Sequence, residues 1–446
     1  ASIVHQRVAA MPLEPNNALS IPRPDGGVDV WAGTQQVSGH RNAISKALGV
    51  DRDLIHVKVP DMGGGFGAKI YCYPEQALTA AIAMRLRRPV RWQETRSENL
   101  LAMTHGRAQT HDVEIGATRD GRITSLRVLA TQDAGAYPVY GAYMPNITQR
   151  MASGPYDIPR IEFRWRSAVT NTTPVHAYRG AGRPEATVDL ERIIDMLAAE
   201  LDLDPAVVRR RNFIRPEQFP HTTATGELYD SGDYAAALDR ALELVDYRSV
   251  RDEQQQRRDA GDRHQLGVGF GSYVEVTAPG GRKDWGRVEV ADTGKVTIYS
   301  GASSHGHSHE TTFSQIVALL LKVSLEDITF VQGDTDVIVR GGGTMGSWSM
   351  QMAGTALHRA GVSVIDKARA IVAHQAEASI DDVVQFDDGR IGIAGVPDTG
   401  RTLAEVAVLA ADPGSLPEDM ESGLEAEDVW VQEEASFAFG THVSVA

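Results

Sequence analysis

Three closely spaced histidines could hold a metal ion. His305, His307 and His309 are each two residues apart in the stretch "GASSHGHSHE". In an extended strand alternate side chains share one face, so two or three imidazoles could reach one divalent ion, with Glu310 or Asp334 as the carboxylate of a metallohydrolase. The residues that follow, "TTFSQIVALLL", predict a helix instead, and a helix that starts here would separate the three rings. A metal site and a plain capping or hydrogen-bonding role both remain open.

Four glycine-rich turns indicate a different chemistry. They are "DMGGGFGAK" at 61–69, "AYRGAGRPEA" at 177–186, "GASSHGHSHETTFSQIVA" at 301–318 and "GDTDVIVRGGGTMGSWS" at 333–349. Each turn follows an expected strand, where glycine lets backbone N–H groups approach a ligand and a helix start favours an anion. The first turn matches neither the dinucleotide pattern nor the P-loop. Together the four turns predict one elongated, phosphate-bearing ligand held by backbone from several segments.

The second turn also carries a candidate catalytic arginine. Arg179 could point a planar, permanently charged donor group at a substrate or at a developing negative charge. Arginine beside a glycine turn often only pairs with a neighbouring carboxylate, and Glu185 is close enough in sequence to be that partner. The residues alone leave both interpretations open.

The composition excludes several classes of protein. The chain has 446 residues, of which 42% are hydrophobic and 23% charged, and its formal net charge is -15. These values are typical of a globular protein with two domains, and an acidic chain is a poor partner for nucleic acid or an anionic membrane. No long apolar run predicts a membrane span, and we expect a cytoplasmic location. The single cysteine, Cys72, excludes intrachain disulfides and a cysteine-ligated iron-sulfur cluster within this chain.

The elements that must position these turns predict an α+β architecture, because long strands and helices occur without regular alternation. Turn chemistry predicts hairpins at Asp120–Gly121, Thr293–Gly294 and Asp388–Gly389. Apolar periodicity predicts helices over 75–87, 187–201, 204–212, 233–246, 311–322, 350–377 and 402–411.

We expect a first domain over 1–215, a connector over 216–265 and a second domain over 266–446. The connector includes the charged stretch 247–265, which has few large apolar residues. Both ends of the chain are strand-like, "ASIVHQRVAA" and "FAFGTHVSVA", so we expect it to be part of a longer protein. No tandem repeat of 20 to 50 residues is evident.

Taken in order, "GGGFG", "AYRGAGRPE", "HETTFSQ", "GDTD" and "GTMGS" resemble the motifs of the molybdenum-binding large subunit of the xanthine oxidase family, especially its carbon-monoxide-dehydrogenase-like and aldehyde-oxidase-like chains. The resemblance runs from "HQRVAAMPLEP" to "GTHVSVA". It implies two large mixed α/β subdomains with molybdopterin cytosine dinucleotide between them. It also implies hydroxylation of an aldehyde or N-heteroaromatic carbon with oxygen from water. Electrons would leave to a [2Fe-2S] small subunit and an FAD-binding medium subunit, in a dimer of heterotrimers.

The resemblance assigns roles to residues. Phe66 would shield the metal, and Arg179 would stabilise negative charge that develops on the substrate oxygen. Asp334 and Asp336 would brace their turn rather than touch the metal, and no protein side chain would ligate it. The cofactor-binding residues would be Gly64, Gly65, Phe66, Gly67, Ala177, Arg179, Gly306, His307, Ser308, His309, Glu310, Thr311, Thr344, Gly346, Ser347 and Ser349.

Several positions depart from the family pattern. Gly180 stands where the carbon-monoxide enzymes carry a cysteine, which argues against oxidation of carbon monoxide. Ile70 stands where purine hydroxylases place a glutamate, which favours a less polar aldehyde or heteroaromatic substrate. His307, Ser308 and Trp348 replace a glutamine, a glycine and an arginine, so the cofactor is expected to be held differently or more weakly.

The family's catalytic base also lacks a counterpart. It is a glutamate in a Gly-Glu motif, and no matching motif occurs before Ala446. We therefore expect the chain alone to be inactive, with the base supplied by residues outside it. The alternatives are a divalent-metal hydrolase that uses His305, His307 and His309, and a non-catalytic relative that only assembles with partners.

Overall fold

The largest sheet contains the predicted Asp120–Gly121 hairpin, whose two strands carry alternating apolar residues. In the computed structural model, which describes residues 1–278 and 281–446, Val113, Leu126 and Val128 of this sheet are buried in one core with α5. The strand order is β1-β8-β9-β10, and neighbours are antiparallel except for β9 and β10. The strands are β1 (Ser2–His5), β8 (Gln109–Ala117), β9 (Ile123–Gly135) and β10 (Ile161–Val169).

Helices and a two-stranded ribbon pack against the buried face of this sheet. The first of the longer helices, α5, follows Gly182, whose φ of 89° suits glycine and whose N–H donates to Glu185 at 2.9 Å. Buried Arg209 of α6 donates to Glu191 of α5 at 2.9 Å, and Glu191 also accepts from the N–H of Ser272 in the ribbon. These elements are α4 (Met144–Arg150), α5 (Arg183–Glu200), α6 (Pro205–Asn212), α7 (Tyr234–Leu244), β13 (Val268–Thr277) and β20 (Ser436–Val445).

In the sequence, a small α/β unit follows β1 and precedes the other three strands of the large sheet. Its strand order is β5-β4-β3-β6, and β4 and β5 are parallel because α1 crosses over between them. Val30, Ile44 and Val57 meet in its core. The unit consists of β3 (Asn17–Pro22), β4 (Val28–Ala32), α1 (Val37–Leu48), β5 (Ile55–Lys58), α2 (Pro74–Leu86) and β6 (Val90–Gln93).

A second unit repeats this plan late in the chain. Its order is β16-β15-β14-β19, with β15 parallel to β16 and α9 between them. The two crossover helices also end alike, in left-handed residues Gly49 and Lys322. Because the large sheet separates the copies in sequence, they form no tandem repeat. The second unit consists of β14 (Arg282–Val290), β15 (Val296–Ser300), α9 (His309–Leu321), β16 (Ile328–Val331), α10 (Thr355–Gln375) and β19 (Leu424–Gln432).

Shorter elements connect these parts. The strands are β2 (Val8–Ala9), β7 (His105–Gly106), β11 (His221–Thr222), β12 (Leu228–Tyr229), β17 (Val383–Gln385) and β18 (Ile391–Ile393). The helices are α3 (Arg96–Ala102), α8 (Tyr247–Asp259) and α11 (Leu403–Ala411). Single helical turns are η1 (Arg52–Leu54), η2 (Tyr140–Tyr143), η3 (Pro216–Gln218), η4 (Leu325–Asp327), the π-helical η5 (Met350–Gly354), η6 (Ile380–Asp382), η7 (Pro397–Thr399) and η8 (Pro413–Ser415).

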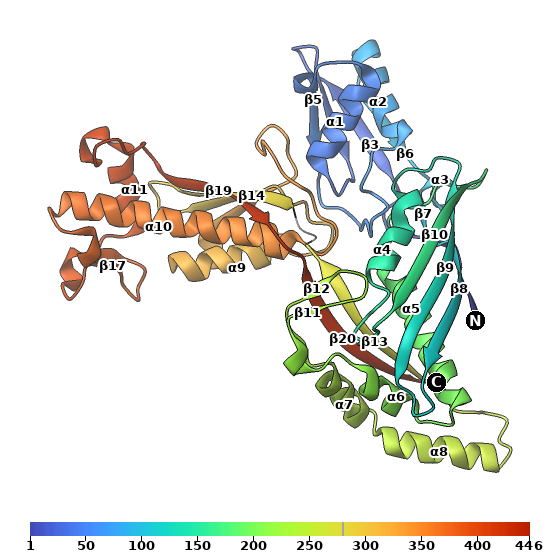
Figure 1. Cartoon of the computed structure of the whole chain (residues 1–446). Helices are drawn as coiled ribbons and strands as arrows, with labels where there is room; N and C mark the ends of the chain where they lie inside the picture. The colour runs from blue at the N-terminus through green and yellow to red at the C-terminus, as the bar shows by residue number, and fades with distance from the viewer. Residues whose placement is uncertain (279–280) are drawn as a thin grey trace.

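The parts form a branched molecule. Figure 1 shows the first α/β unit in blue at the top, the large sheet at the right and the second unit as an arm to the left. The β13–β20 ribbon runs from the arm down to α6 and α7. Apolar residues of this ribbon, among them Val274, Val276 and Phe437, share a core with the large sheet. Within the described residues, every helix is too short or too polar to cross a lipid bilayer.

The structure confirms the α+β class, the three hairpins and, within a few residues, the seven helices. The continuous first strand is wrong, because "ASIVHQRVAA" breaks into β1 and β2. Helices α1, α3 and α4 were not predicted, and the charged stretch 247–265 contains the helix α8. The domain boundaries at 215 and 265 stay a prediction. Helix α7 lies within 216–265, and its Leu238 is buried in the core of the large sheet.

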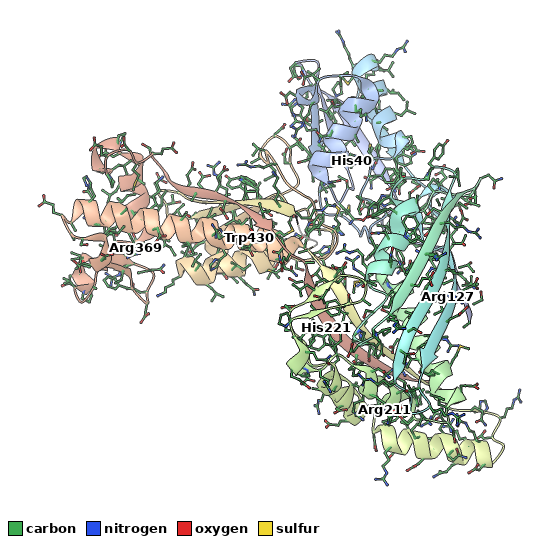
Figure 2. The ribbon with its side chains drawn as sticks, viewed as in Figure 1. His40, Arg127, Arg211, His221, Arg369 and Trp430 are labelled. Carbon is green, nitrogen blue, oxygen red and sulfur yellow. The ribbon has the colours of Figure 1, made fainter. Side chains whose placement is uncertain are left out.

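Acid should destabilise the first α/β unit through His40 of α1, which Figure 2 labels within that unit. His40 is 1% exposed, and burial lowers its pKa from 6.5 to about 4. The folded chain therefore keeps this ring neutral while the unfolded chain protonates it, so its contribution is complete above pH 6.5 and is lost as the pH falls towards 4. We expect His40→Leu to reduce the acid-induced loss of unfolding free energy by about 3 kcal/mol between pH 7 and pH 4, measured by urea denaturation.

The control for this prediction is His264→Leu, in an exposed loop after α8. It should leave the pH dependence unchanged. An identical pH dependence in the wild type and in His40→Leu would contradict the role assigned to His40.

Candidate functional site

Three of the four glycine-rich turns lie at matching places in the two α/β units, and the second turn lies between β10 and α5. The first turn, 61–69, leaves β5 towards α2, and the fourth, 333–349, leaves β16 towards α10. The third, 301–308, joins β15 to α9, and its counterpart in the first unit is the short segment 33–36, "GTQQ", between β4 and α1. Turns that leave adjacent parallel strands lie at one edge of a sheet, which is where open α/β sheets bind ligands.

Gln35 joins the first and fourth turns through its buried side chain. Its Oε1 accepts hydrogen bonds from the N–H groups of Gly67 at 2.8 Å and Lys69 at 3.3 Å, and its Nε2 donates to the carbonyl of Thr344 at 3.0 Å. The Gln35 backbone adds two more bonds, to the carbonyl of Lys69 at 2.8 Å and from the N–H of Thr344 at 2.9 Å. One residue from the "GTQQ" segment therefore holds the two turns together.

Glycine is required where these turns touch. A Cβ on Gly65 would lie 2.6 Å from the Gln35 side chain, and a Cβ on Gly343 would lie 2.3 Å from the Gln35 carbonyl. On Gly67, at a φ of +98°, a Cβ would lie 2.6 Å from the carbonyl of Ala177 in the second turn. The predicted residues Gly65, Gly67 and Ala177 thus lie together, and the glycines serve close packing between turns.

Phe66 and Arg179 face each other across the first and second turns. The Arg179 N–H donates to the Phe66 carbonyl at 2.9 Å, and its guanidinium carbon lies 5.8 Å from the centre of the Phe66 ring. Glu185 caps α5 instead of pairing with Arg179, and it lies 3.8 Å from Arg107. Among the described residues none forms an ion pair or hydrogen bond with the exposed Arg179 guanidinium. Its charge is therefore available to a ligand.

Thr344 connects the third and fourth turns. Its hydroxyl accepts from the N–H of Ser303 at 3.0 Å and from the hydroxyl of Ser349 at 3.1 Å. Thr344 and Ser349 are buried, so their side chains hold the turns together from inside. Ser347, at a φ of +57°, donates instead to Glu275 at the end of β13, at 3.0 Å.

The fourth turn also binds the first α/β unit through β5. Val59 N–H donates to the Gly333 carbonyl at 2.7 Å, and Thr335 N–H donates to the Val57 carbonyl at 3.0 Å. These two bonds extend the pairing of β5 into the second unit.

Charged side chains surround that contact. Asp336 lies 3.2 Å from Arg23 and 3.3 Å from Lys58, and it also hydrogen-bonds His56. Burial opposes ionisation, but the bonds from His56, Lys58 and Arg23 hold the pKa of Asp336 below its usual value. Asp334 lies 4.0 Å from Lys58. Both aspartates contact Lys58 of the first unit, and the bracing role that the resemblance implies for them in their own turn stays a prediction.

The rings of the three histidines lie in a row, edge-on or tilted to one another, rather than surround an ion. The ring centres of His305 and His307 are 4.2 Å apart, those of His307 and His309 are 5.2 Å apart, and His309 stacks on Phe313 at 4.7 Å. Burial lowers the pKa of His305 and of His309 to about 4. Burial and, to a smaller extent, the charge of Arg179 lower the pKa of His307.

These rings do not form a metal site among the described residues, since their nitrogens do not all come within 4.8 Å of one another. The described group that does is His5 of β1, His111 of β8 and Asp189 of α5. Its members already bind each other, with His5 at 2.9 Å and His111 at 2.6 Å from Asp189.

The start of α9 fits an anion. Ser308 has a φ of +56° and makes no side-chain cap, and the N–H groups of Ser308, His309, Glu310 and Thr311 have no partner among the described residues. A Cβ on Gly306, at a φ of +108°, would meet nothing within 4 Å. His309 is 4% exposed and its Nδ1 lacks a hydrogen-bond partner. Open space beside free backbone donors fits a phosphate group.

The substitution at Trp348 is accommodated. Its ring is 6% exposed, and its Nε1 donates to the Gly343 carbonyl at 3.0 Å. The Arg282 guanidinium lies 5.3 Å from the ring centre, so a cation remains near this turn.

Two buried charged groups also belong to the site and were not predicted. Asp284 lies between the third and fourth turns, where its carboxylate accepts from the N–H of Trp285 at 2.8 Å, and burial raises its pKa to about 6. Lys69 lies 3.5 Å from Glu14, and burial lowers its pKa. In the sequence only Lys69 could have been noticed, because it follows a glycine-rich turn. No signal in the sequence indicated Asp284.

Known proteins share this architecture. Two families, both described as molybdopterin cofactor-binding domain, match residues 1–213 and 240–446. The chain is 33% identical to the nicotine 6-hydroxylase large subunit of Paenarthrobacter nicotinovorans, over 98% of this chain and 55% of that one. It is 34% identical to the carbon monoxide dehydrogenase large chain of Hydrogenophaga pseudoflava, over 99% and 56%. Quinoline 2-oxidoreductase from Pseudomonas putida 86 superimposes with a TM-score of 0.92 at 31% identity, covering 100% of this chain and 58% of that one.

The chain spans about half the length of the curated relatives that it matches.

Removing the Gln35 side chain should loosen the first and fourth turns. Gln35→Ala leaves the N–H groups of Gly67 and Lys69 and the carbonyl of Thr344 without this partner, which we expect to cost about 3 kcal/mol of unfolding free energy. Thermal denaturation would measure the loss, and amide hydrogen exchange would locate it in the two turns. Gln36→Ala is the matched control, because none of these bonds involves that side chain. Equal stability and equal exchange in the two variants would contradict the role of Gln35.

Proposed function

This chain belongs to the xanthine oxidase family of molybdenum hydroxylases, as its molybdopterin-binding large subunit, and on that basis we propose that it forms most of the cofactor site of an enzyme that hydroxylates an aldehyde or an N-heteroaromatic carbon. The observation that carries the proposal is the convergence of all four turns. Gln35 ties the first to the fourth, Gly67 packs on the second, and Thr344 ties the fourth to the third.

The cofactor would lie along this convergence. The dinucleotide diphosphate would bind the free N–H groups at the start of α9, where Gly306, His307, Ser308, His309, Glu310 and Thr311 stand. The turn that contains Gly346 and Ser347 would line the same ligand, while Thr344 and Ser349 fix its shape from below. When bound, the molybdenum cofactor would supply two-electron oxidation of a carbon with oxygen from water. The cytosine form of the dinucleotide follows the family resemblance.

Phe66 and Arg179 would form the wall on the substrate side. Phe66 is 37% exposed at the tip of the first turn, beside Gly64 and Gly67, where it would exclude water from the metal. Arg179 keeps a charge that no described residue pairs, so its guanidinium would bind the substrate oxygen as that atom gains negative charge. If Ile70 also lines this wall, as the family resemblance implies, the absence of a carboxylate there would suit an apolar carbon compound.

The remaining parts of the reaction would come from outside this chain. The only cysteine is Cys72, so [2Fe-2S] centres and FAD would sit on small and medium partner subunits, in a dimer of heterotrimers in the cytoplasm. The family's base glutamate has no counterpart among these 446 residues, so another residue would take the proton from the attacking water. The relatives named as large subunits and large chains support a complex of several subunits.

Two rival functions have weaker support. A divalent-metal hydrolase would need the nitrogens of His305, His307 and His309 to converge, and within the described residues the rings lie in a row instead. A non-catalytic relative would explain His307 and Trp348, but Arg282 over Trp348 and the open start of α9 support the proposed anion site.

Cofactor retention tests the proposal directly. We expect the complex, purified from a host that makes the cofactor, to contain about one molybdenum per large subunit and to release a cytosine nucleotide on denaturation. Gly306→Val should lose most of both, because a branched side chain is strained at a φ of +108° and would cover the free N–H groups. Gly261→Val, at a φ of +62° with open space in a distant loop, is the matched control. A wild-type complex without molybdenum would overturn the proposed function.

Arg179 should act on turnover rather than on cofactor binding. We expect Arg179→Met to lower kcat by roughly 10²- to 10³-fold with unchanged molybdenum content, because a preorganised charge stabiliser is lost. Dye reduction with quinoline or benzaldehyde as the electron donor measures the rate. Arg119→Met, in the exposed β8–β9 turn, should have no effect. If Arg179→Met kept its full kcat, the role of Arg179 would be wrong.

A further inference from the structure

Aromatic side chains form a continuous row that leads away from the first and second turns. Tyr71 stacks on His176 with ring centres 4.9 Å apart, and Tyr140 lies 5.6 Å from His176. Tyr143 lies 6.2 Å from Tyr140 and 6.5 Å, edge-on, from Trp165 of β10. We call Tyr71, His176, Tyr140, Tyr143 and Trp165 the aromatic row.

The aromatic row begins at the candidate site. Tyr71 follows Lys69 by two residues, and His176 directly precedes Ala177, whose carbonyl packs against Gly67. Burial lowers the pKa of His176 to about 4. At neutral pH this end of the row is therefore uncharged.

The fold fixes the middle of the row. Tyr140 and Tyr143 begin and end the helical turn η2, and a Cβ on Gly141 between them would lie 1.9 Å from the carbonyl of Val175. This close packing holds the turn against the segment that carries His176. The rings are nevertheless exposed, Tyr140 by 43%, Tyr143 by 50% and Trp165 by 37%. Rigidly held rings that remain exposed are typical of binding surfaces.

The charges around the row disfavour a cationic ligand. Arg150, the last residue of α4, donates from its Nε to Glu227 at 2.6 Å, which neutralises its charge. Arg179, near the inner end, keeps its positive charge. A cationic ring would be repelled on its way to Arg179, whereas a neutral ring would not.

Resting on the proposed function, we infer that the aromatic row determines substrate specificity at that same site, by stacking a planar, uncharged nitrogen heterocycle as it approaches Phe66 and Arg179. Offset or edge-on ring contacts add attraction beyond the burial of apolar area. An aliphatic aldehyde has no ring to stack, so the row favours the heterocycle over the aldehyde.

Steady-state kinetics of the complete complex tests this inference. With quinoline as the substrate, Tyr140→Leu should raise KM by about three- to tenfold with little change in kcat, because one ring contact is lost. With butyraldehyde, KM should change less than about twofold, because no ring contact exists to lose. Naphthalene, which has no ring nitrogen, should inhibit the wild type competitively and should inhibit Tyr140→Leu more weakly. Tyr137→Leu, 72% exposed and with no ring neighbour among the described residues, is the matched control.

Each outcome decides the inference. Tyr143→Leu provides a second variant if Tyr140→Leu fails to fold, and the same pattern is expected of it. Equal KM changes for quinoline and butyraldehyde, or none for either, would overturn the inference while molybdenum content and turnover still support the proposed function. Loss of partner subunits without a change in substrate preference would instead show that the row is covered by protein. Absence of molybdenum and of turnover would overturn the proposed function itself.

Discussion

The candidate site depends on one buried amide group. Gln35 gives both of its side-chain polar atoms and both of its backbone groups to the first and fourth turns, which belong to different α/β units. Buried polar groups must be hydrogen-bonded, so neither turn can move away without leaving several donors and acceptors unpaired. The glycines at 65 and 343 follow from this arrangement, because any side chain there would collide with Gln35.

Duplication of the α/β unit explains why the site lies where it does. Each unit carries two turns at the edge where its parallel strands end, and β5 of the first pairs with residues that follow β16 of the second. The two edges therefore face each other. The copies then differ in one respect: the "GTQQ" segment is short and joins the turns, whereas the third turn is longer and leaves the start of α9 free. The first unit therefore holds the turns together, and the second leaves backbone N–H groups free for a ligand.

Local chemistry decided what could be predicted from the sequence. Asp-Gly and Thr-Gly turns fixed the hairpins, and apolar stripes fixed most helices, since both signals lie within a few residues. Helix α1 was missed because a buried histidine, His40, stands in its apolar stripe beside Gly39. Gln35 was missed because its partners, Gly67 and Thr344, are distant in sequence. The predicted turns do come together, but which of their side chains face a ligand and which hold the turns was not readable from residue type.

The electrostatics of the site explains how it tolerates unusual side chains. The chain carries a net charge of -15, and two of the three histidines in the third turn have a pKa of about 4, so imidazolium groups contribute little attraction for an anion at neutral pH. Backbone N–H groups at the start of α9 remain, and their number does not depend on side-chain identity. Tryptophan can therefore occupy position 348, with Arg282 above it, without removing the main donors. Substitutions of the glycines change the backbone conformation, so we expect them to damage such a site most.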